Sequence, residues 1–321
     1  MASWQSQLIK FTLRNRHLMQ GSLKRPAWDF NTSIPAFREM CEKGAARAKM
    51  PAGVEAVPVQ IEGLPAGLAA EWLQPNAANP VPMVEDAVIF YTHGGGYISG
   101  SCSDHRALVA KLVAASGIRL LLFEYRLAPE HPYPAALEDT LTAYRWLLRQ
   151  ITPQTRLFIA GESAGGGLCL ATLLQLKDLG MRMPLAGISI SPMTDLKMTG
   201  SPNRVKDAIE PAGMNEVCCA YYVGDNDPTL PYISPLFGDL RGLPPLLMFV
   251  GGDEGILDDS VRFEAKARAA GVEVKLFVGE GQIHCYPLLP DFIPESKAAM
   301  DEISAFLRKH LERAAQPALA A

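Results

Sequence analysis

The length, composition and charge of the chain exclude several classes of protein. The chain has 321 residues, of which 48% are hydrophobic and 20% charged, and its formal net charge is −4. This length fits one large domain or two small ones, and it allows a substantial buried core. The charge balance offers no basic surface for nucleic acid, so we expect the partner to be a small, neutral or mildly apolar molecule.

The sequence gives no indication of membrane insertion or metal binding. No apolar run approaches the roughly 20 residues that span a bilayer, and the first twenty residues lack the apolar core of a secretory signal. The six cysteines show no metal-like CxxC spacing, and in a chain without a signal we expect reduced thiols. We therefore expect a cytoplasmic protein without stable membrane insertion.

From about Glu55 to Leu307, strand-like and helix-like stretches alternate. The expected strands are Gly67–Leu73, Ala87–Thr92, Ile118–Tyr125, Thr155–Ala160, Leu185–Ser191, Pro245–Gly251 and Val272–Val278. The expected helices are Asp104–Ala115, Ala135–Arg149, Gly166–Leu179, Asp259–Ala270 and Glu295–His310. The central strands are nearly continuous in Val, Ile, Leu and Phe, which is typical of a sheet covered on both faces. This pattern predicts an α/β protein with a mostly parallel sheet.

Two regions interrupt the alternation. The first fifty residues look helical before any strand appears, and residues 197–224 separate two strands. Insertions at the carboxyl ends of strands in such sheets commonly lie over the ligand crevice. We interpret residues 1–50 and 197–224 as segments of one helical cap, and residues 51–196 and 225–321 as the catalytic domain.

Two glycine-rich motifs carry the chemistry. Gly161-Glu162-Ser163-Ala164-Gly165 joins an expected strand to an expected helix, as a nucleophile elbow does. His93-Gly94-Gly95-Gly96 follows another strand, and its backbone N–H groups suit an oxyanion hole. We expect Ser163 to be the nucleophile. The expected oxyanion donors are Gly95, Gly96 and Ala164, with Gly94 needed for the turn of the loop.

A serine nucleophile requires a base. His284 follows the strand Val272–Val278 through a glycine-containing loop, so it projects from a strand end, where the base must lie. His93 is expected to brace the oxyanion loop by hydrogen bonds. The other histidines are interpreted as solvated (His17 and His310) or as structural (His105 and His131).

The acid of the triad is ambiguous from pattern alone. In hydrolases with such an elbow, the acid lies between the serine and the histidine in the chain. Asp253 and Glu254 are adjacent carboxylates at the end of one strand, and Asp195 follows another. Residue type and position do not choose among these three.

Together these motifs resemble the hormone-sensitive-lipase-like branch of the α/β-hydrolases, which includes many bacterial carboxylesterases. The resemblance extends from about Val57 to Leu307 and includes the stretches YRLAPEHPYPA (125–135), SPMTDL (191–196) and SPLF (234–237). It implies an α/β-hydrolase fold with an eight-stranded, mostly parallel sheet, a helical cap and no cofactor.

The resemblance also bears on the acid. The family acid usually lies in a D-P-L-x-D stretch, which here reads Glu254-Gly255-Ile256-Leu257-Asp258. Glu254 then falls on the acid position with the usual family spacing to His284, and the family counterpart of Asp195 is not the triad acid. Glu254 is therefore the expected acid, and Asp253 is the alternative. The family usually has Asp or Thr at the position of Glu162, and we expect no loss of activity from this difference.

The sequence thus predicts a serine carboxylic ester hydrolase that acts on short- to medium-chain esters through an acyl-enzyme. One alternative is an amide hydrolase or deacetylase with the same triad. A second is a ligand-binding receptor without catalysis, which is disfavoured because both Ser163 and His284 are present. The expected partner is a small ester, and the resemblance suggests a homodimer through an edge strand.

Overall fold

Eight strands form one sheet in the order β1-β2-β4-β3-β5-β6-β7-β8 in the computed structural model, which describes residues 2–19, 21–23, 25–201, 207 and 209–315. The pairs β1–β2 and β2–β4 are antiparallel, and the other pairs are parallel. The strands are Val54–Val59 (β1), Ala70–Pro75 (β2), Ala87–Thr92 (β3), Arg119–Phe123 (β4), Arg156–Glu162 (β5), Ala186–Ile190 (β6), Leu246–Gly251 (β7) and Val274–Gly279 (β8). The predicted α/β architecture with a mostly parallel sheet is confirmed.

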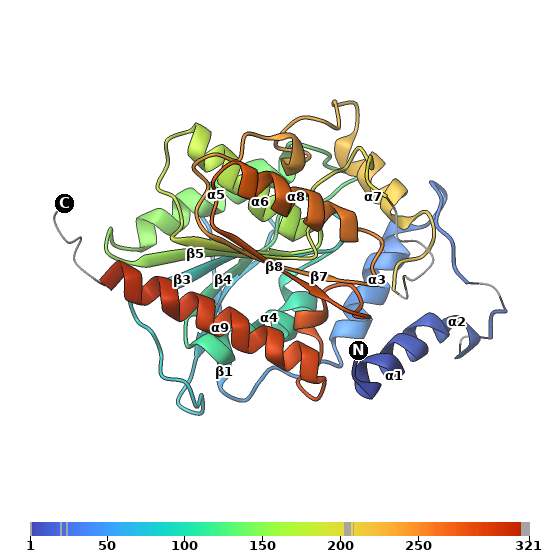
Figure 1. The fold of residues 1–321 in the computed structure, drawn as a ribbon, viewed down its shortest axis with the longest axis horizontal. Coiled ribbons are helices and arrows are strands. Elements are labelled where there is room, and N and C mark those ends of the chain that lie inside the picture. The colour runs from blue at the N-terminus through green and yellow to red at the C-terminus, as the bar shows by residue number, and fades with distance from the viewer. Residues whose placement is uncertain (1, 20, 24, 202–206, 208, 316–321) are drawn as a thin grey trace.

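Helices cover both faces of the sheet (Figure 1). Helices α5, α6 and α8 pack on one face, and α4 and α9 pack on the other. Along β3, Val88 and Phe90 belong to the first core, whereas Ile89 and Tyr91 belong to the second. Because alternate side chains enter opposite cores, this strand must be apolar throughout. The helices of these two layers are Cys102–Ser116 (α4), Ala135–Gln150 (α5), Ala164–Asp178 (α6), Leu257–Ala269 (α8) and Pro294–Ala315 (α9).

The eighth strand, β1, is absent from the strands expected from residue pattern, although the resemblance implied eight. It lies at the edge of the sheet, and its burial does not alternate regularly. It also contains Pro58, which cannot donate a ladder hydrogen bond and is tolerated at a sheet edge. These features weaken the strand signal in the sequence.

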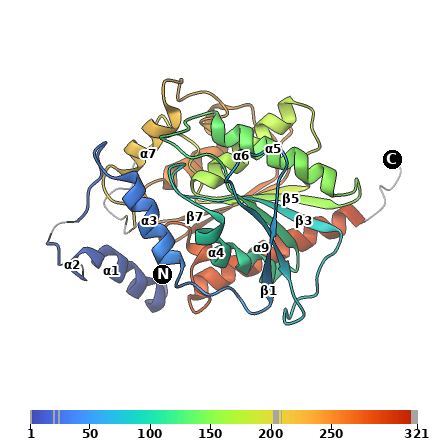
Figure 2. The ribbon, with the colours of Figure 1, turned by 180° about the vertical axis from the view of Figure 1, so that it is seen from behind.

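The two segments expected to form the cap contact each other. The first contains Trp4–Arg14 (α1), Arg16–Met19 (α2) and Ile34–Ala45 (α3), and the second contains Met214–Val223 (α7). The N–H of Trp28 donates to the carbonyl of Ala212 at 2.7 Å, and the two segments share a β-bridge there. Both ribbon views place α3 and α7 at the same end of the molecule (Figures 1 and 2).

The division into cap and catalytic domain stays a prediction. Residues 1, 20, 24, 202–206, 208 and 316–321, which belong to the predicted segments, lie outside the described residues.

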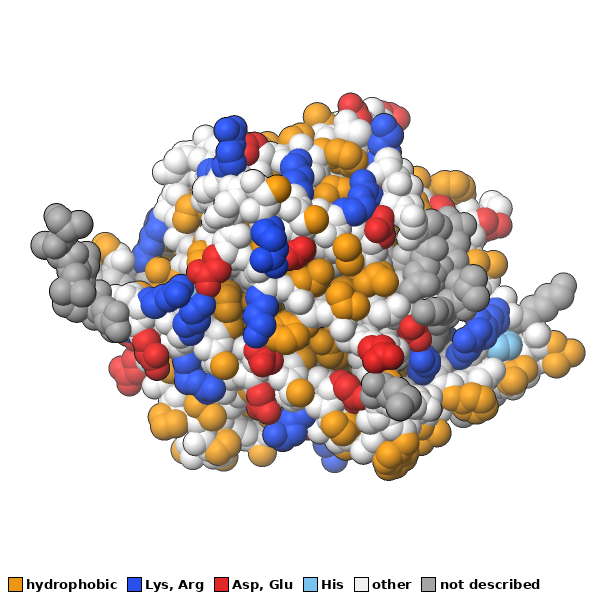
Figure 3. Space-filling view, viewed as in Figure 1, with side chains coloured by type: hydrophobic (Ala, Val, Ile, Leu, Met, Phe, Trp, Pro, Cys, Tyr) orange, Lys and Arg blue, Asp and Glu red, His pale blue; other side chains and the backbone are white. Residues whose placement is uncertain are grey.

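The surface carries charges of both signs. Lys and Arg side chains are interspersed with Asp and Glu on the face shown in Figure 3, in keeping with the small net charge. Within the described ranges, no helix is long and apolar enough to cross a membrane.

Candidate active site

Ser163 lies at a sharp turn between β5 and α6. Its backbone has φ 55° and ψ −124°, a positive-φ conformation that is rare for residues other than glycine. A Cβ atom at Gly165 would lie 2.2 Å from the carbonyl oxygens of both Thr92 and His93. The glycine is therefore required because α6 begins in direct contact with the end of β3, and the turn holds Ser163 beside the oxyanion loop.

The structure brings Ser163, His284 and Glu254 into one hydrogen-bonded chain. The His284 Nε2 atom is 2.9 Å from the Ser163 Oγ atom, and the His284 Nδ1 atom is hydrogen bonded to Glu254 Oε2. The other oxygen of Glu254 accepts from the Ser191 hydroxyl at 2.8 Å and from the N–H of Gly251. These contacts fix the fully buried carboxylate and leave one oxygen for the imidazole.

The environment of His284 favours its charged form. Burial lowers the pKa of the imidazole, but the interactions of the ring with Cys285 and Glu254 outweigh burial, and the pKa of His284 lies well above its ordinary value. Burial also raises the pKa of the Cys285 thiol, so at neutral pH this thiol is uncharged. Glu254 is then the charge that stabilises a proton on His284.

The other two candidate acids lie elsewhere. The Asp253 carboxylate pairs with Lys10 of α1, with 2.8 Å between Oδ2 and Nζ. The Asp195 carboxylate accepts from Arg262 at 2.7 Å and from the N–H of Thr199 at 2.9 Å. Of the three carboxylates, only Glu254 is within hydrogen-bond distance of His284.

The oxyanion loop lies against the elbow. A Cβ atom at Gly94 would be 3.2 Å from the Cβ of Ser163, and the N–H of Gly94 donates to the Glu162 carboxylate at 2.6 Å. Among the described residues, the N–H groups of Gly95, Gly96 and Ala164 donate to no protein acceptor, so they are available to a substrate oxygen. The N–H of Gly94 is already engaged by Glu162, and the assignment of the oxyanion donors stays a prediction.

His93 supports the loop as expected. Its Nδ1 atom is 2.8 Å from the carbonyl oxygen of Gly94, and its ring stacks on Tyr125 with 4.2 Å between ring centroids. The Tyr125 hydroxyl donates to the His93 carbonyl at 2.7 Å, which ties the YRLAPEHPYPA stretch to the loop. Burial, and then the positive charge of His105, lower the pKa of His93 to about 4, so the ring is neutral.

Two histidine interpretations were wrong. His17 and His310 were expected to be solvated, but they are only 8% and 5% exposed. The ring of His310 packs on Phe306 with 4.5 Å between centroids, and burial lowers its pKa. Charged neighbours in the sequence gave the wrong signal because consecutive residues of a helix point in different directions, so a histidine beside charged residues can still face inward.

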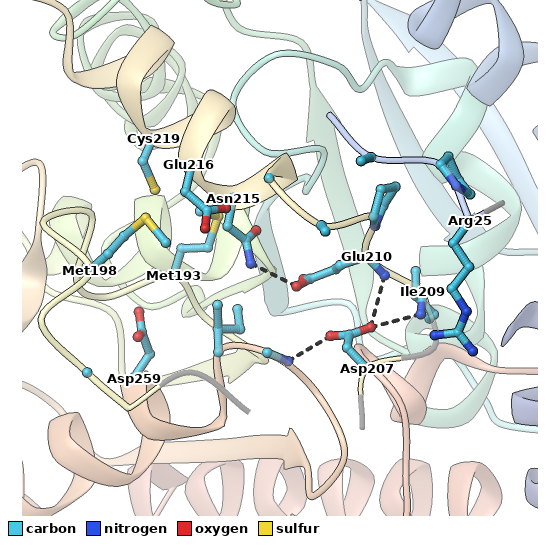
Figure 4. A pocket seen from close by; sticks show the side chains of 18 of the residues that line it. Arg25, Met193, Met198, Asp207, Ile209, Glu210, Asn215, Glu216, Cys219 and Asp259 are labelled. Atoms are coloured by element: carbon cyan, nitrogen blue, oxygen red, sulfur yellow. Dashed lines mark hydrogen bonds between the residues drawn. The ribbon is translucent and has the colours of Figure 1, made fainter. Parts of the chain in front are cut away.

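Figure 4 shows side chains that line a cavity of about 320 Å³. Its lining comes from both predicted cap segments and from the residues after β6 and β7, and it includes neither Ser163 nor His284. Glu210 lines it, and Glu210 Oε1 is 3.9 Å from the His284 Nδ1 atom. Asn215 donates to the other oxygen of Glu210 at 2.8 Å. The cavity is therefore on the acid side of the imidazole rather than over the nucleophile.

We expect Glu210 to make the reaction rate depend on pH. Burial raises the pKa of Glu210 to about 7, opposed by the charge of His284 and reinforced by Asp207 and Glu254. Above pH 7 the ionised carboxylate stabilises the imidazolium in the transition state, and below pH 7 it is protonated. A charge at 4 Å contributes ~1 kcal/mol even in water, or roughly fivefold in rate. In Glu210→Gln, kcat should therefore fall about fivefold above pH 7 and approach the wild-type value below it.

The matched control is Glu216→Gln, which removes another carboxylate from the lining of the same cavity. Its rate relative to the wild type should be constant with pH. A constant ratio for Glu210→Gln as well would contradict the expected role.

Sequence reasoning missed three residues that contact the candidate triad or its loop: Glu162, Ser191 and Glu210. Glu162 and Ser191 stand inside recognised motifs, but their side-chain partners are distant in the chain. Glu210 has no motif around it, and only the fold brings it to His284.

The comparisons with known proteins establish the family. A family model described as "alpha/beta hydrolase fold" matches residues 89–288, so the chain belongs to the α/β-hydrolase family. An acetyl-hydrolase of Streptomyces hygroscopicus is 38% identical over 243 residues, which cover 74% of this chain and 79% of that protein.

Solved structures agree over nearly the whole chain. EstE5, in a crystal soaked with p-nitrophenyl butyrate, has a TM-score of 0.84 and 38% identity, covering 96% of this chain and 99% of EstE5. An esterase from the bacterial hormone-sensitive lipase family has a TM-score of 0.84 and 34% identity, covering 97% of this chain and 99% of that chain. These matches confirm the predicted family, fold and class of enzyme, a serine ester hydrolase.

Proposed function

We propose that this protein is a carboxylesterase that hydrolyses short- to medium-chain esters through an acyl-enzyme formed on Ser163. The observation that carries the proposal is the continuous chain from Ser163 Oγ through His284 to Glu254. A serine so placed has its base within reach, and the base is oriented by a buried carboxylate.

The reaction proceeds in two halves. His284 takes the proton of Ser163 as the hydroxyl attacks the ester carbonyl, and Glu254 orients the imidazole and stabilises its charge. The N–H groups of Gly95, Gly96 and Ala164 stabilise the oxyanion. His284 then protonates the leaving alcohol, and a water molecule repeats the sequence to release the acid.

The packing of α7 supports an upper limit on acyl length. A Cβ atom at Gly96 would lie 2.7 Å from the sulfur of Cys218, and the rings of Tyr97 and Tyr222 stack with 3.7 Å between centroids. The second cap segment therefore lies directly on the oxyanion loop. Space beside the loop is restricted, which favours short acyl groups.

Two experiments test the proposal together. A fluorophosphonate should label the wild-type protein once, at Ser163, and should not label Ser163→Ala. Turnover of p-nitrophenyl esters should be highest for the short acyl chains, with butyrate as the first probe. Labelling with turnover of a matched anilide but not of the ester would indicate an amide hydrolase. Absence of both labelling and turnover would indicate a receptor.

The proposal also includes a cytoplasmic location and a homodimer. All six cysteines are free, as in a reducing compartment. β8 lies at the edge of the sheet, and an edge strand offers unpaired backbone groups to a second copy. Light scattering on the purified protein would measure the oligomeric state.

A further inference from the structure

Glu162 is a buried carboxylate that the proposed reaction does not use. It is the last residue of β5 and directly precedes Ser163, and its side chain is only 4% exposed. A buried charge must be paired and hydrogen bonded to be tolerated. The hydrogen-bond and ion-pair partners of Glu162 therefore indicate the role of its side chain.

Three donors from three parts of the chain converge on Glu162. Its Oε1 atom accepts from the N–H of Gly94 at 2.6 Å and lies 3.0 Å from His105 Nε2, on α4. Its Oε2 atom accepts from the Tyr91 hydroxyl, at the end of β3. One side chain thus links the nucleophile strand, the oxyanion loop and the first turn of α4.

His105 supplies the compensating charge. Its Nδ1 atom pairs with Asp104, which also caps α4 by accepting from the N–H of Ser101 at 2.8 Å. Burial lowers the pKa of His105, but hydrogen bonds to Asp104 and Glu162 raise it to about 10. The imidazolium pairs with the Glu162 carboxylate, and a carboxylate acceptor forms a stronger hydrogen bond to the N–H of Gly94 than a neutral acceptor would.

We propose, resting on the proposed function, that Glu162 is a positioning residue of the oxyanion hole, and that its carboxylate orients the HGGG loop through the N–H of Gly94. Because the peptide unit is planar, a hydrogen bond that fixes the N–H of Gly94 also fixes the orientation of the peptide plane between His93 and Gly94. Gly95 and Gly96 follow at φ 111° and 65°, where glycine itself imposes little restraint. The direction of their N–H groups therefore depends on an external anchor, and Glu162 provides it.

The primary test is steady-state kinetics of Glu162→Ala on p-nitrophenyl butyrate. Because the oxyanion donors are then misdirected, kcat should fall about 10²-fold, which is the effect of losing one donor. KM should change by less than about twofold. The inhibition constant of a short-chain trifluoromethyl ketone, which forms the oxyanion, should rise in proportion to the loss in kcat/KM. Glu162→Gln keeps an oxygen for Gly94 but loses the charge, so kcat should fall about tenfold; it also carries the test if the alanine variant does not fold.

The matched control is Glu124→Gln. Glu124, like Glu162, accepts from the backbone, namely from the N–H groups of Ala69 and Cys102 at 3.0 Å each, and neither of these donors belongs to the HGGG loop. A merely structural role predicts that Glu162 variants lower the melting temperature as this control does, with kcat unchanged. That result, or a ketone affinity unaffected in Glu162→Ala, would overturn the proposal. Failure of the wild type itself to hydrolyse esters or to be labelled would instead overturn the proposed function.

Discussion

Replacing Ser163 with alanine is expected to lower kcat for p-nitrophenyl butyrate by about 10⁶-fold, because no acyl-enzyme can form without the hydroxyl. His284 and Glu254 then lose their role, since they act only on the proton of that hydroxyl. The oxyanion donors remain, and they leave a residual rate of roughly 10³–10⁴ over the reaction in water. Steady-state kinetics before and after treatment with a fluorophosphonate would separate this residual rate from contaminating wild-type enzyme, which the reagent inactivates.

Ser189→Ala is the matched control for this substitution. Ser189 lies on the neighbouring strand β6, is fully buried and donates its hydroxyl to the Gly166 carbonyl at 3.1 Å. It tests the loss of a buried hydroxyl next to the elbow without loss of the nucleophile. Near wild-type activity is expected for this control. Comparable activity of Ser163→Ala and the wild type would mean that the nucleophile lies elsewhere.

The central sheet was predictable from the sequence because its strands are buried on both faces. β3 and β7 are apolar at nearly every position, as is typical of strands that are buried on both faces. β1 was missed because its residues are half exposed at an edge and include Pro58. The sequence pattern of a strand was therefore clearest where the strand is most buried, and the candidate site lies at the ends of those central strands.

The nucleophile and base were predictable because backbone geometry constrains the local sequence. Gly165 must be glycine where α6 contacts the end of β3, and that requirement is visible as a motif. The acid was not fixed by pattern because Asp253 and Glu254 occupy the same strand end. The two side chains leave the turn after β7 in different directions, so Asp253 pairs with Lys10 and Glu254 with His284.

The supporting residues were not predictable because their partners are remote in sequence. Glu162 reaches Gly94 and His105, and Glu210 reaches His284, across separations that no local pattern records. His105 illustrates the limit: its position in the first turn of a helix indicated a structural residue, but not the ion pair behind the oxyanion loop.

Replacing Glu254 with glutamine is expected to lower kcat by about 10⁴-fold, as loss of the acid does in other Ser-His-acid triads. The amide can still contact Nδ1, but it carries no charge to stabilise the imidazolium and favours the wrong tautomer of His284. Glu254 is fully buried, so water cannot replace the lost charge. Stopped-flow measurement of the acylation burst with p-nitrophenyl butyrate would locate the loss in the chemical step.

Asp253→Asn provides the matched comparison, because it removes the adjacent carboxylate from the same strand end. Asp253 pairs with Lys10 near the surface, where an ion pair contributes only about 0–1 kcal/mol to stability and nothing to the imidazole. We expect kcat within about twofold of the wild type for this variant. A large loss in Asp253→Asn together with a small one in Glu254→Gln would reverse the assignment, since the charge that supports His284 would then come from the residue one position earlier in the chain.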